Sequence, residues 1–342
     1  MIAPILLKEW RGNVLENVHH GLVCGIDAEK QPIFSVGDTT TPVFYRSALK
    51  PIQAIPVFET AVFEKYGIST TEAALCTASQ RGELYHQHAL QSLLEKLGLA
   101  EDQLVCHASY PLNEAPKFER LWQQQPHRKL HHNCAGKHLG LLAACRAHGW
   151  PEKDYEHLDH PVQQRILDVL SILAEVPKEE IELGTDGCGV PVFAVPLQHM
   201  AISYLKFAVP ELIEDQALRK TVTAIGDIMN QHPTIVASHN FICTALLEDD
   251  NIVAKGGAQG VYCFALRKEK MAFALKVLSG AEHVWPFLVA NLLEQIHYDN
   301  KDTIERLHKL RSKTVVNDAG VPVGKSTVHL VNECNKMEGF HA

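Results

Sequence analysis

Residues 252–277 read IVAKGGAQGVYCFALRKEKMAFALKV, and they give the strongest single indication of the fold. Three β-rich runs in this stretch, Ile252–Lys255, Gly260–Leu266 and Met271–Val277, are separated by short turns. Apolar, β-branched and aromatic residues between glycine-rich or charged turns are typical of consecutive strands. The sequence therefore predicts an antiparallel sheet late in the chain.

The beginning of the chain predicts more sheet, at Ile5–Glu9, Val14–Val23 and Pro32–Val36. The tail adds a hairpin at Val315–Val323. Apolar residues recur at helical spacing in ten other segments, Ala48–Tyr66, Thr70–Ala78, Leu84–Leu97, Ala115–Gln124, Ala135–Ala147, Pro161–Ala174, Leu197–Phe207, Asp215–Gln231, Ala281–Ile296 and Lys301–Ser312. An α+β fold follows, with an antiparallel sheet from both chain termini and a helical middle section. Since no repeat or linker interrupts this plan, we expect a single domain over residues 1–342.

Composition limits the classes of function. Hydrophobic residues make up 46% of the chain and charged residues 21%, as in ordinary globular proteins. The net charge of −8 is not accompanied by a basic face, which argues against nucleic acid or a membrane surface as partner and favours a small substrate. Met1–Lys8 is too short an apolar run for a signal peptide, and nine scattered cysteines favour a reducing compartment. We therefore expect a cytoplasmic protein.

The first candidate for chemistry is the Ser-x-x-Lys motif formed by Ser47 and Lys50. On a helix this spacing brings a hydroxyl and an amine to one face, so the lysine can act as the base of the serine. Pro51 restricts the helix start to the region of Ser47, where the positive end of the helix favours a developing alkoxide. Ser203 and Lys206 show the same spacing within an ordinary amphipathic helix. The alternative is that Ser47 merely caps a helix and Lys50 is solvated.

Ser79 and Lys255 are a second serine and a second lysine that lie where a predicted helix or strand ends and side chains can reach a substrate. Ser79 follows an apolar helix and precedes polar residues and a glycine, although it can also be read as the cap of the Leu84–Leu97 helix. Lys255 ends a strand before three glycines in five residues, a turn that lets the backbone approach a ligand. An isolated surface charge is the alternative for Lys255. A second amine close to the first would favour the neutral form that a base requires.

A third group consists of sulfur and nitrogen donors. Cys134, Lys137 and His138 share one face at the start of a predicted helix, and Asp186 and Cys188 lie in a glycine-rich turn. Two thiolates with an amine, an imidazole or a carboxylate are ligands that suit zinc. A redox or nucleophilic thiol is the rival interpretation, because a helix N-terminus lowers the pKa of a cysteine.

Five ordered blocks together resemble one family, namely Arg46–Pro51, Ala78–Glu83, Asn133–His138, Asp186–Pro191 and Lys255–Val261. Their order and spacing are similar to those of the class 3, rhizobial-type L-asparaginases. The similarity covers nearly the whole chain, from the first strands to the Gly320–Gly324 hairpin.

The resemblance implies a fold similar to serine β-lactamases and glutaminases, and a homodimer. It implies two catalytic pairs, Ser47 with Lys50 and Ser79 with Lys255. It also implies three zinc ligands, Cys134, Lys137 and Cys188. Three further residues, Arg46, His138 and Asp186, lie where the family has residues that order the site or hold substrate. Two departures affect the substrate more than the reaction type: the family often has a histidine at Gln80, and a glycine- and arginine-containing turn at Val236–Phe241.

The predicted reaction is hydrolysis of L-asparagine to L-aspartate and ammonia. Ser47 attacks the carboxamide, Lys50 takes the proton, and Ser79 and Lys255 relay protons and tune charge, although the two serines can exchange roles. We expect zinc to stabilise the site and hold substrate rather than to generate the nucleophile. The alternatives are a glutaminase-like or penicillin-interacting acyl transferase on the same scaffold, and a zinc-binding module without enzymatic activity.

Overall fold

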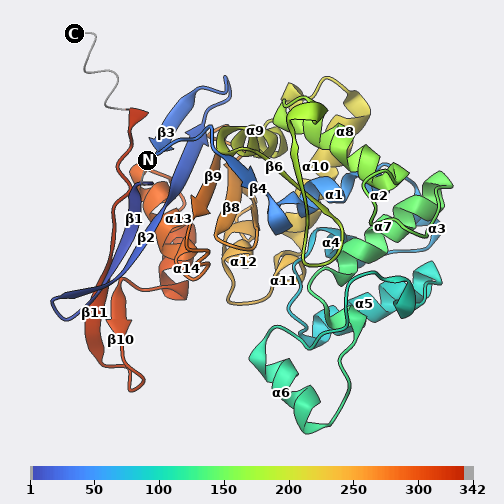
Figure 1. Ribbon diagram of the computed structural model, residues 1–342, viewed down its shortest axis with the longest axis horizontal. Helices are drawn as coiled ribbons and strands as arrows, with labels where there is room; N and C mark the ends of the chain where they lie inside the picture. Colours follow the sequence, from blue (N-terminus) through green and yellow to red (C-terminus); the bar gives the residue numbers. More distant parts are fainter. Residues whose placement is uncertain (1–2, 335–342) are drawn as a thin grey trace. The chain divides into compact units, whose positions relative to one another are not determined.

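The computed structural model describes residues 3–334 (Figure 1). They divide into two compact units. Unit 1 comprises residues 3–48, 195–209 and 240–334, and unit 2 comprises residues 49–194 and 210–239. The single domain expected over residues 1–342 stays a prediction, because a division into compact units does not establish how many of them fold independently.

Unit 1 is built on an antiparallel sheet from both chain ends, and Figure 1 shows these blue and orange-red strands side by side. Among the described residues it has eight strands in the order β10-β11-β1-β2-β9-β8-β7, with β3 also paired to β2. Their bounds are β1 Ile5–Arg11, β2 Val14–Ile26, β3 Pro32–Val36, β7 Ile252–Gly256, β8 Val261–Leu266, β9 Met271–Val277, β10 Thr314–Val316 and β11 Pro322–Val328. The predicted α+β plan is confirmed, including the C-terminal hairpin.

Helices cover this sheet because its central strands are apolar on both faces. Every residue of β7 and β8 is buried, as expected for strands enclosed on two sides. Helix α9 packs across β2, β8 and β9, and α12 contacts β7. The remaining elements of unit 1 are β4 Pro42–Phe44, α9 Leu197–Ala208, α12 Ile242–Leu247, α13 Trp285–Gln295 and α14 Lys301–Leu310.

Unit 2 is mainly helical, as predicted for the middle of the chain. The single helix expected over Ala48–Tyr66 is wrong: the chain forms η1 (Arg46–Leu49), α1 (Lys50–Gln53), α2 (Ile55–Phe58) and α3 (Val62–Lys65). Pro51 and Pro56 each lie in the first turn of a new helix. A proline lacks the N–H that would continue the preceding helix, so the run is divided into short pieces.

The longer helices of unit 2 lie close to their predicted positions. They are α5 Leu84–Leu97, α6 Glu114–Trp122, α7 Ala135–His148, α8 Pro161–Ala174 and α10 Gln216–Gln231. Two shorter helices are α4 Thr70–Ala74, inside the predicted Thr70–Ala78 segment, and α11 Pro233–Val236, which the sequence did not predict. Short 3-10 helices are η2 Leu75–Thr77, η3 Glu101–Gln103, η4 Lys129–His131, η5 Lys178–Glu180 and η6 Pro210–Leu212. None of the helices within residues 3–334 combines the length and apolar character needed to cross a bilayer.

Helix α7 is the centre of unit 2. It is buried from Ala135 to Cys145 and packs against α2, α5 and η2. Two glycines allow the close approach of η2: a Cβ at Gly136 would lie 2.3 Å from the carbonyl oxygen of Leu75, and one at Gly140 would lie 2.8 Å from the sulfur of Cys76. The chain that continues from η2 to Ser79 is therefore held against the start of α7.

A hairpin that the sequence did not predict completes this region. Strand β5 (Glu182–Thr185) pairs antiparallel with β6 (Pro191–Pro196), in a register that runs from Glu182 opposite Ala194 to Thr185 opposite Pro191. The connection contains Cys188 and Gly189, whose φ of +93° lies in a region that favours glycine. The glycine-rich turn identified in the sequence is the tip of this hairpin.

Candidate active site

In unit 1, hydrogen bonds from α9 hold the segment that carries Ser47. The Tyr45 hydroxyl lies 2.8 Å from the Ser203 hydroxyl, and the Tyr204 hydroxyl donates to the carbonyl oxygen of Ala48 at 2.6 Å. Ser203 therefore makes a structural contact, but α9 is buried along most of its length and is not the amphipathic helix that the sequence predicted. Ser47 is half-buried inside η1, while Leu49 is the N-cap of α1, so Ser47 does not cap that helix.

The end of β7 lies against the same segment. A Cβ at Gly257 would lie 2.4 Å from the carbonyl oxygen of Tyr45, so only glycine allows this approach. Lys255 precedes it and is 1% exposed, and its ammonium donates to the carbonyl oxygen of Gly256 at 2.8 Å. The surface-charge interpretation of Lys255 is wrong. An ammonium is costly to bury, which favours a functional reason for this lysine.

Arg46 lines a cavity of about 300 Å³ in unit 1. Its backbone has a φ of +50°, an uncommon conformation for a residue with a side chain and one that is frequent at functional sites. Lys276 lines the same cavity, and burial together with the charge of Arg46 lowers the pKa of Lys276. Two cations that repel each other across a cavity create a place for an anionic group.

In unit 2, Lys50 and Ser79 form a buried amine–hydroxyl pair. Lys50 is 1% exposed and donates to the Ser79 hydroxyl at 3.0 Å and to the carbonyl oxygens of Ala78 and Asn133 at 2.7 and 3.2 Å. The solvated interpretation of Lys50 is therefore wrong. Glu83 is the N-cap of α5, so the capping interpretation of Ser79 is wrong as well. An amine in contact with a hydroxyl is suited to exchange a proton with it.

The two units divide the predicted catalytic residues. Ser47 and Lys255 belong to unit 1, whereas Lys50 and Ser79 belong to unit 2. The hydrogen bond from Lys50 to Ser79 joins members of different predicted pairs, and the spacing within the sequence did not indicate it. The catalytic roles assigned to the four residues remain predictions.

Gln80 positions the chain around Ser79. It is fully buried, and its amide nitrogen faces the carbonyl oxygens of residues 130–132, of which that of His132 is closest at 2.8 Å. Its side-chain oxygen accepts from the backbone of Gly82 at 2.6 Å. An amide offers two donors and an acceptor here, more than a neutral histidine can. The only signal for this role in the sequence was the departure from the family pattern.

The second segment that departs from the family pattern, Val236–Phe241, also lies beside Ser79. The backbone N–H of Ser79 donates to the carbonyl oxygen of Val236 at 2.8 Å. Further along this segment, Ser238 accepts from the Asn113 amide at 3.0 Å, and His239 lies 3.1 Å from the Tyr85 hydroxyl. Sequence reasoning did not identify Tyr85 or Asn113, because neither belongs to a motif.

Cys134, Lys137, His138 and Cys188 converge in unit 2 and are called the thiolate cluster below. All are buried, with exposures of 3%, 2%, 0% and 3%. The Lys137 ammonium lies 2.9 Å from the Cys188 sulfur. Cys134 is the N-cap of α7, and the β5–β6 hairpin supplies Cys188. The structure therefore brings together the sulfur and nitrogen donors that the sequence had grouped.

The sulfurs of Cys134 and Cys188 share a negative charge next to the ammonium of Lys137. A hydrogen bond from Cys188, helped by the charges of Lys50 and Lys137, holds the pKa of Cys134 well below its usual value despite burial. The same hydrogen bond and burial raise the pKa of Cys188. Burial acts to lower the pKa of Lys137, but the charges of the two sulfurs outweigh it and raise that pKa. These directions favour a thiolate at Cys134, a thiol at Cys188 and a protonated amine at Lys137.

His138 completes the donor set. Its Nδ1 lies 2.7 Å from the Tyr155 hydroxyl. Its Nε2 is buried and meets no geometric hydrogen-bond criterion within residues 3–334, although an interaction with the Cys188 sulfur acts on the pKa of the ring. Burial lowers the pKa of His138 to about 4, against the opposing effect of Cys188, so the ring is neutral at pH 7. Two sulfurs, an amine and a buried imidazole nitrogen are a donor set that fits the four-coordinate preference of zinc.

Comparisons with known proteins give one family. A family model described as L-asparaginase II matches residues 7–328. No curated protein matches the chain in sequence.

Solved structures that resemble the chain include a beta-lactamase from Mycobacterium bovis, with 11% identity, a TM-score of 0.39 and coverage of 80% of this chain and 94% of that one. A mutant of simvastatin synthase from Aspergillus terreus shows 13% identity, a TM-score of 0.35 and coverage of 75% and 86%. TM-scores this low support no conclusion about function.

Proposed function

We propose how this chain, which belongs to the L-asparaginase II family and is an L-asparaginase, carries out its reaction. The reaction hydrolyses the side-chain amide of L-asparagine and yields L-aspartate and ammonia. The observation that carries the activity is the family match over residues 7–328. The proposal concerns the residues that perform the reaction, and the contacts of Lys50 and of the thiolate cluster support it.

In the proposed mechanism the Ser47 hydroxyl attacks the carboxamide carbon. Lys50 takes the hydroxyl proton and returns one to the leaving nitrogen, so the C–N bond breaks and ammonia departs. Water then adds to the Ser47 ester and releases aspartate. Ser79, hydrogen-bonded to Lys50 at 3.0 Å, relays protons, and Lys255 tunes the charge. The Ser-x-x-Lys motif and the burial of both lysines support these assignments.

We assign the binding of the substrate carboxylate to Arg46. It lines a cavity together with Lys276, and two cations suit a carboxylate. Asp186 is partly exposed, as a group that contacts the substrate ammonium needs to be. His138 is fully buried, which favours ordering the site over contact with substrate.

We further propose a zinc ion held by Cys134, Lys137 and Cys188, with His138 as fourth ligand or support. The buried Nε2 of His138, which interacts with the Cys188 sulfur, and the soft donors around it support this site. Bound zinc would neutralise the buried sulfur charge and fix the β5–β6 hairpin against α7. Lys137 has to lose its proton to act as a ligand. The serine and lysine residues supply nucleophile and base, so the ion is assigned no step of the reaction.

The cytoplasmic location and the homodimer are proposals that rest on the sequence. The cysteine pattern supports the compartment, and the family resemblance supports the dimer. Light scattering of the purified protein tests the dimer directly.

Ammonia release tests the substrate. Purified protein should release ammonia from L-asparagine and little from L-glutamine, and it should leave a chromogenic β-lactam intact. Equal turnover of glutamine would favour the glutaminase-like alternative, and β-lactam turnover the penicillin-interacting one. A protein that contains zinc but acts on none of the three would be a zinc-binding module.

Serine substitutions test the mechanism. Ser47→Ala should lower kcat by about 10⁴-fold or more, because the reaction loses its nucleophile. Ser203→Ala, in the other Ser-x-x-Lys motif, is the matched control and should retain turnover. Mass spectrometry of the acylated protein should locate the acyl group on the Ser47 peptide. An acyl group on Ser79, with turnover retained in Ser47→Ala, would reverse the roles of the two serines.

A further inference from the structure

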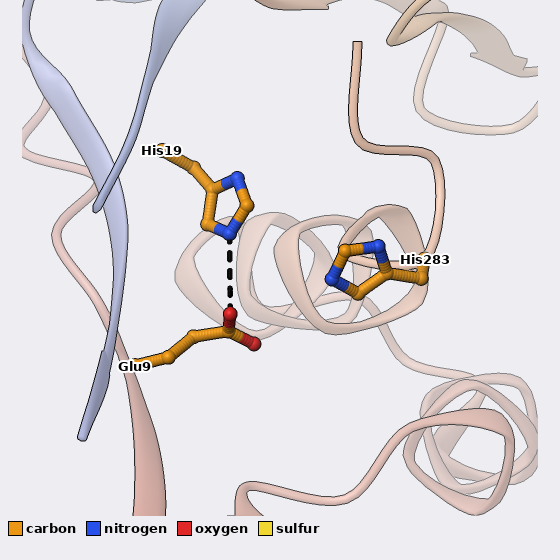
Figure 2. Close-up of side chains that lie close together, drawn as sticks. All are labelled: Glu9, His19 and His283. Atoms are coloured by element: carbon orange, nitrogen blue, oxygen red, sulfur yellow. Dashed lines mark hydrogen bonds and ion pairs between the residues drawn. The ribbon is translucent and has the colours of Figure 1, made fainter. Parts of the chain in front are cut away.

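A second group of metal-type ligands lies in unit 1, outside the residues assigned to the reaction. It consists of Glu9 on β1, His19 on β2 and His283 just before α13. One ligand atom from each of the three lies within 4.8 Å of the others. Figure 2 shows the carboxylate and the two imidazoles pointing into one common space.

Neighbouring side chains hold these ligands in place. The Nδ1 of His19 lies 3.1 Å from the Ser279 hydroxyl, and its Nε2 lies 3.3 Å from the Oε2 of Glu9. The other carboxylate oxygen of Glu9 accepts from Arg311, and Asn17 donates to Oε2 at 3.0 Å. Ligands oriented by a second layer of hydrogen bonds are typical of metal sites.

The group combines burial with access. Glu9 and His19 are each 7% exposed, whereas His283 is exposed and leaves one side open to solvent. Burial acts to raise the pKa of Glu9, but the hydrogen bonds from His19 and Asn17 and the charge of Arg311 lower it, so the group is a carboxylate. Burial and the charge of Arg311 lower the pKa of His283, so its ring is neutral at pH 7. Arg311 donates to Oε1, and a cation bound through Oε2 would share that oxygen with the Asn17 amide and replace only its long contact with His19.

We propose that Glu9, His19 and His283 form a second metal site, which binds one divalent ion of the zinc, cobalt and nickel class. Two imidazole nitrogens and one carboxylate oxygen suit these borderline ions, whereas Mg²⁺ and Ca²⁺ prefer oxygen ligands alone. The ion replaces the long contact between His19 and Glu9, and water completes its shell on the open side. It ties the β1–β2 hairpin to the chain that enters α13.

Titration with Co²⁺ tests this site, because cobalt bound to thiolates shows a sulfur charge-transfer band and cobalt bound to nitrogen and oxygen does not. We expect the intact protein to bind one cobalt ion beyond any bound by the thiolate cluster, and this ion should add visible d–d absorption without adding to the sulfur band. His283→Ala should weaken this binding by at least about tenfold. His88→Ala, which removes an exposed imidazole on α5, is the matched control and should bind as the unchanged protein does.

Thermal denaturation provides a second readout. Added Co²⁺ should raise the Tm of the unchanged protein and of His88→Ala, and this part of the shift should be absent in His283→Ala. Equal cobalt binding in His283→Ala and His88→Ala would overturn the proposal. The proposal would also be overturned if all bound cobalt were thiolate-bound, or if Mg²⁺ raised the Tm as much as Co²⁺ does. Neither readout uses turnover, so the result does not depend on the catalytic assignments.

Discussion

The thiolate cluster of unit 2 and the Glu9–His19–His283 group of unit 1 assemble metal-type ligands in opposite ways. The cluster takes three members from the start of α7 and buries all four, so its charges are balanced by one another and by buried Lys50 and not by solvent. The other group takes its members from both ends of the chain, keeps one side open and has its carboxylate balanced by Arg311. We therefore expect proton uptake to control the buried cluster strongly and the open group weakly.

Acid should produce the largest difference between the units. Burial lowers the pKa of four histidines of unit 2, His86, His131, His132 and His138, to about 4 each. The unfolded chain takes up these protons below about pH 6.5, whereas the native state does so only near pH 4. The free energy of unfolding should therefore fall as pH drops from 6.5 to 4, by about 2 kcal/mol per histidine at pH 5.

Urea unfolding at pH 7 and pH 5, with a chelator present, measures this loss. Hydrogen exchange, corrected for intrinsic rates, should assign it to unit 2. His86→Gln preserves a donor for the carbonyl oxygen of Thr234, which the histidine contacts at 3.0 Å, and should reduce the loss by about 2 kcal/mol. A pH-independent free energy of unfolding, or equal loss of protection in both units, would contradict the comparison.

Removal of a sulfur should have the next largest effect. Structural zinc sites bind with about 10–16 kcal/mol shared among their ligands, so Cys188→Ala should weaken zinc binding to the thiolate cluster by about 100- to 1,000-fold. Cys145→Ala is the control, because Cys145 lies buried in the same helix outside the cluster. Metal analysis after dialysis against a zinc buffer measures both. Unchanged zinc content in Cys188→Ala would eliminate the cluster as a metal site.

The pH dependence of metal affinity should separate the two sites further. Lys137 and Cys188 have raised pKa values and hold protons at pH 7, so metal binding there should release two protons. Affinity at the cluster should then rise about a hundredfold per pH unit, against tenfold or less at Glu9, His19 and His283. Cobalt titrations at pH 6.5 and 7.5 report both slopes, because the sulfur band marks the cluster. Equal slopes would show that burial does not control protonation as argued.

His283→Ala should have the smallest effect. Without metal, the exposed side chain contributes little to stability, and the free energy of unfolding should change by no more than about 0.5 kcal/mol. Urea unfolding in the presence of a chelator measures this change. A loss of several kcal/mol would make His283 a structural residue and would weaken the case for an open metal site.

Periodicity and spacing in the sequence were sufficient for most of the fold and for part of the site. The late strands, the N-terminal strands, α5, α8 and α10 all lie where apolar periodicity predicted them. Cys134, Lys137 and His138 were correctly grouped, because a helix brings residues three or four apart to one face. The helix over Ala48–Tyr66 was wrong because periodicity does not register the breaks that Pro51 and Pro56 impose.

Tertiary structure alone determined the contacts between distant segments. Lys50 meets Ser79 because Gly136 lets η2 pack closely on α7. Glu9 and His19 meet because β1 and β2 pair with Glu9 opposite Asn17, which makes His19 a diagonal neighbour, and His283 joins them from near the other chain end. Sequence spacing specifies which side chains share a face of one element, since its period is local. Which faces then meet depends on strand register and helix packing, and these are properties of the folded chain as a whole.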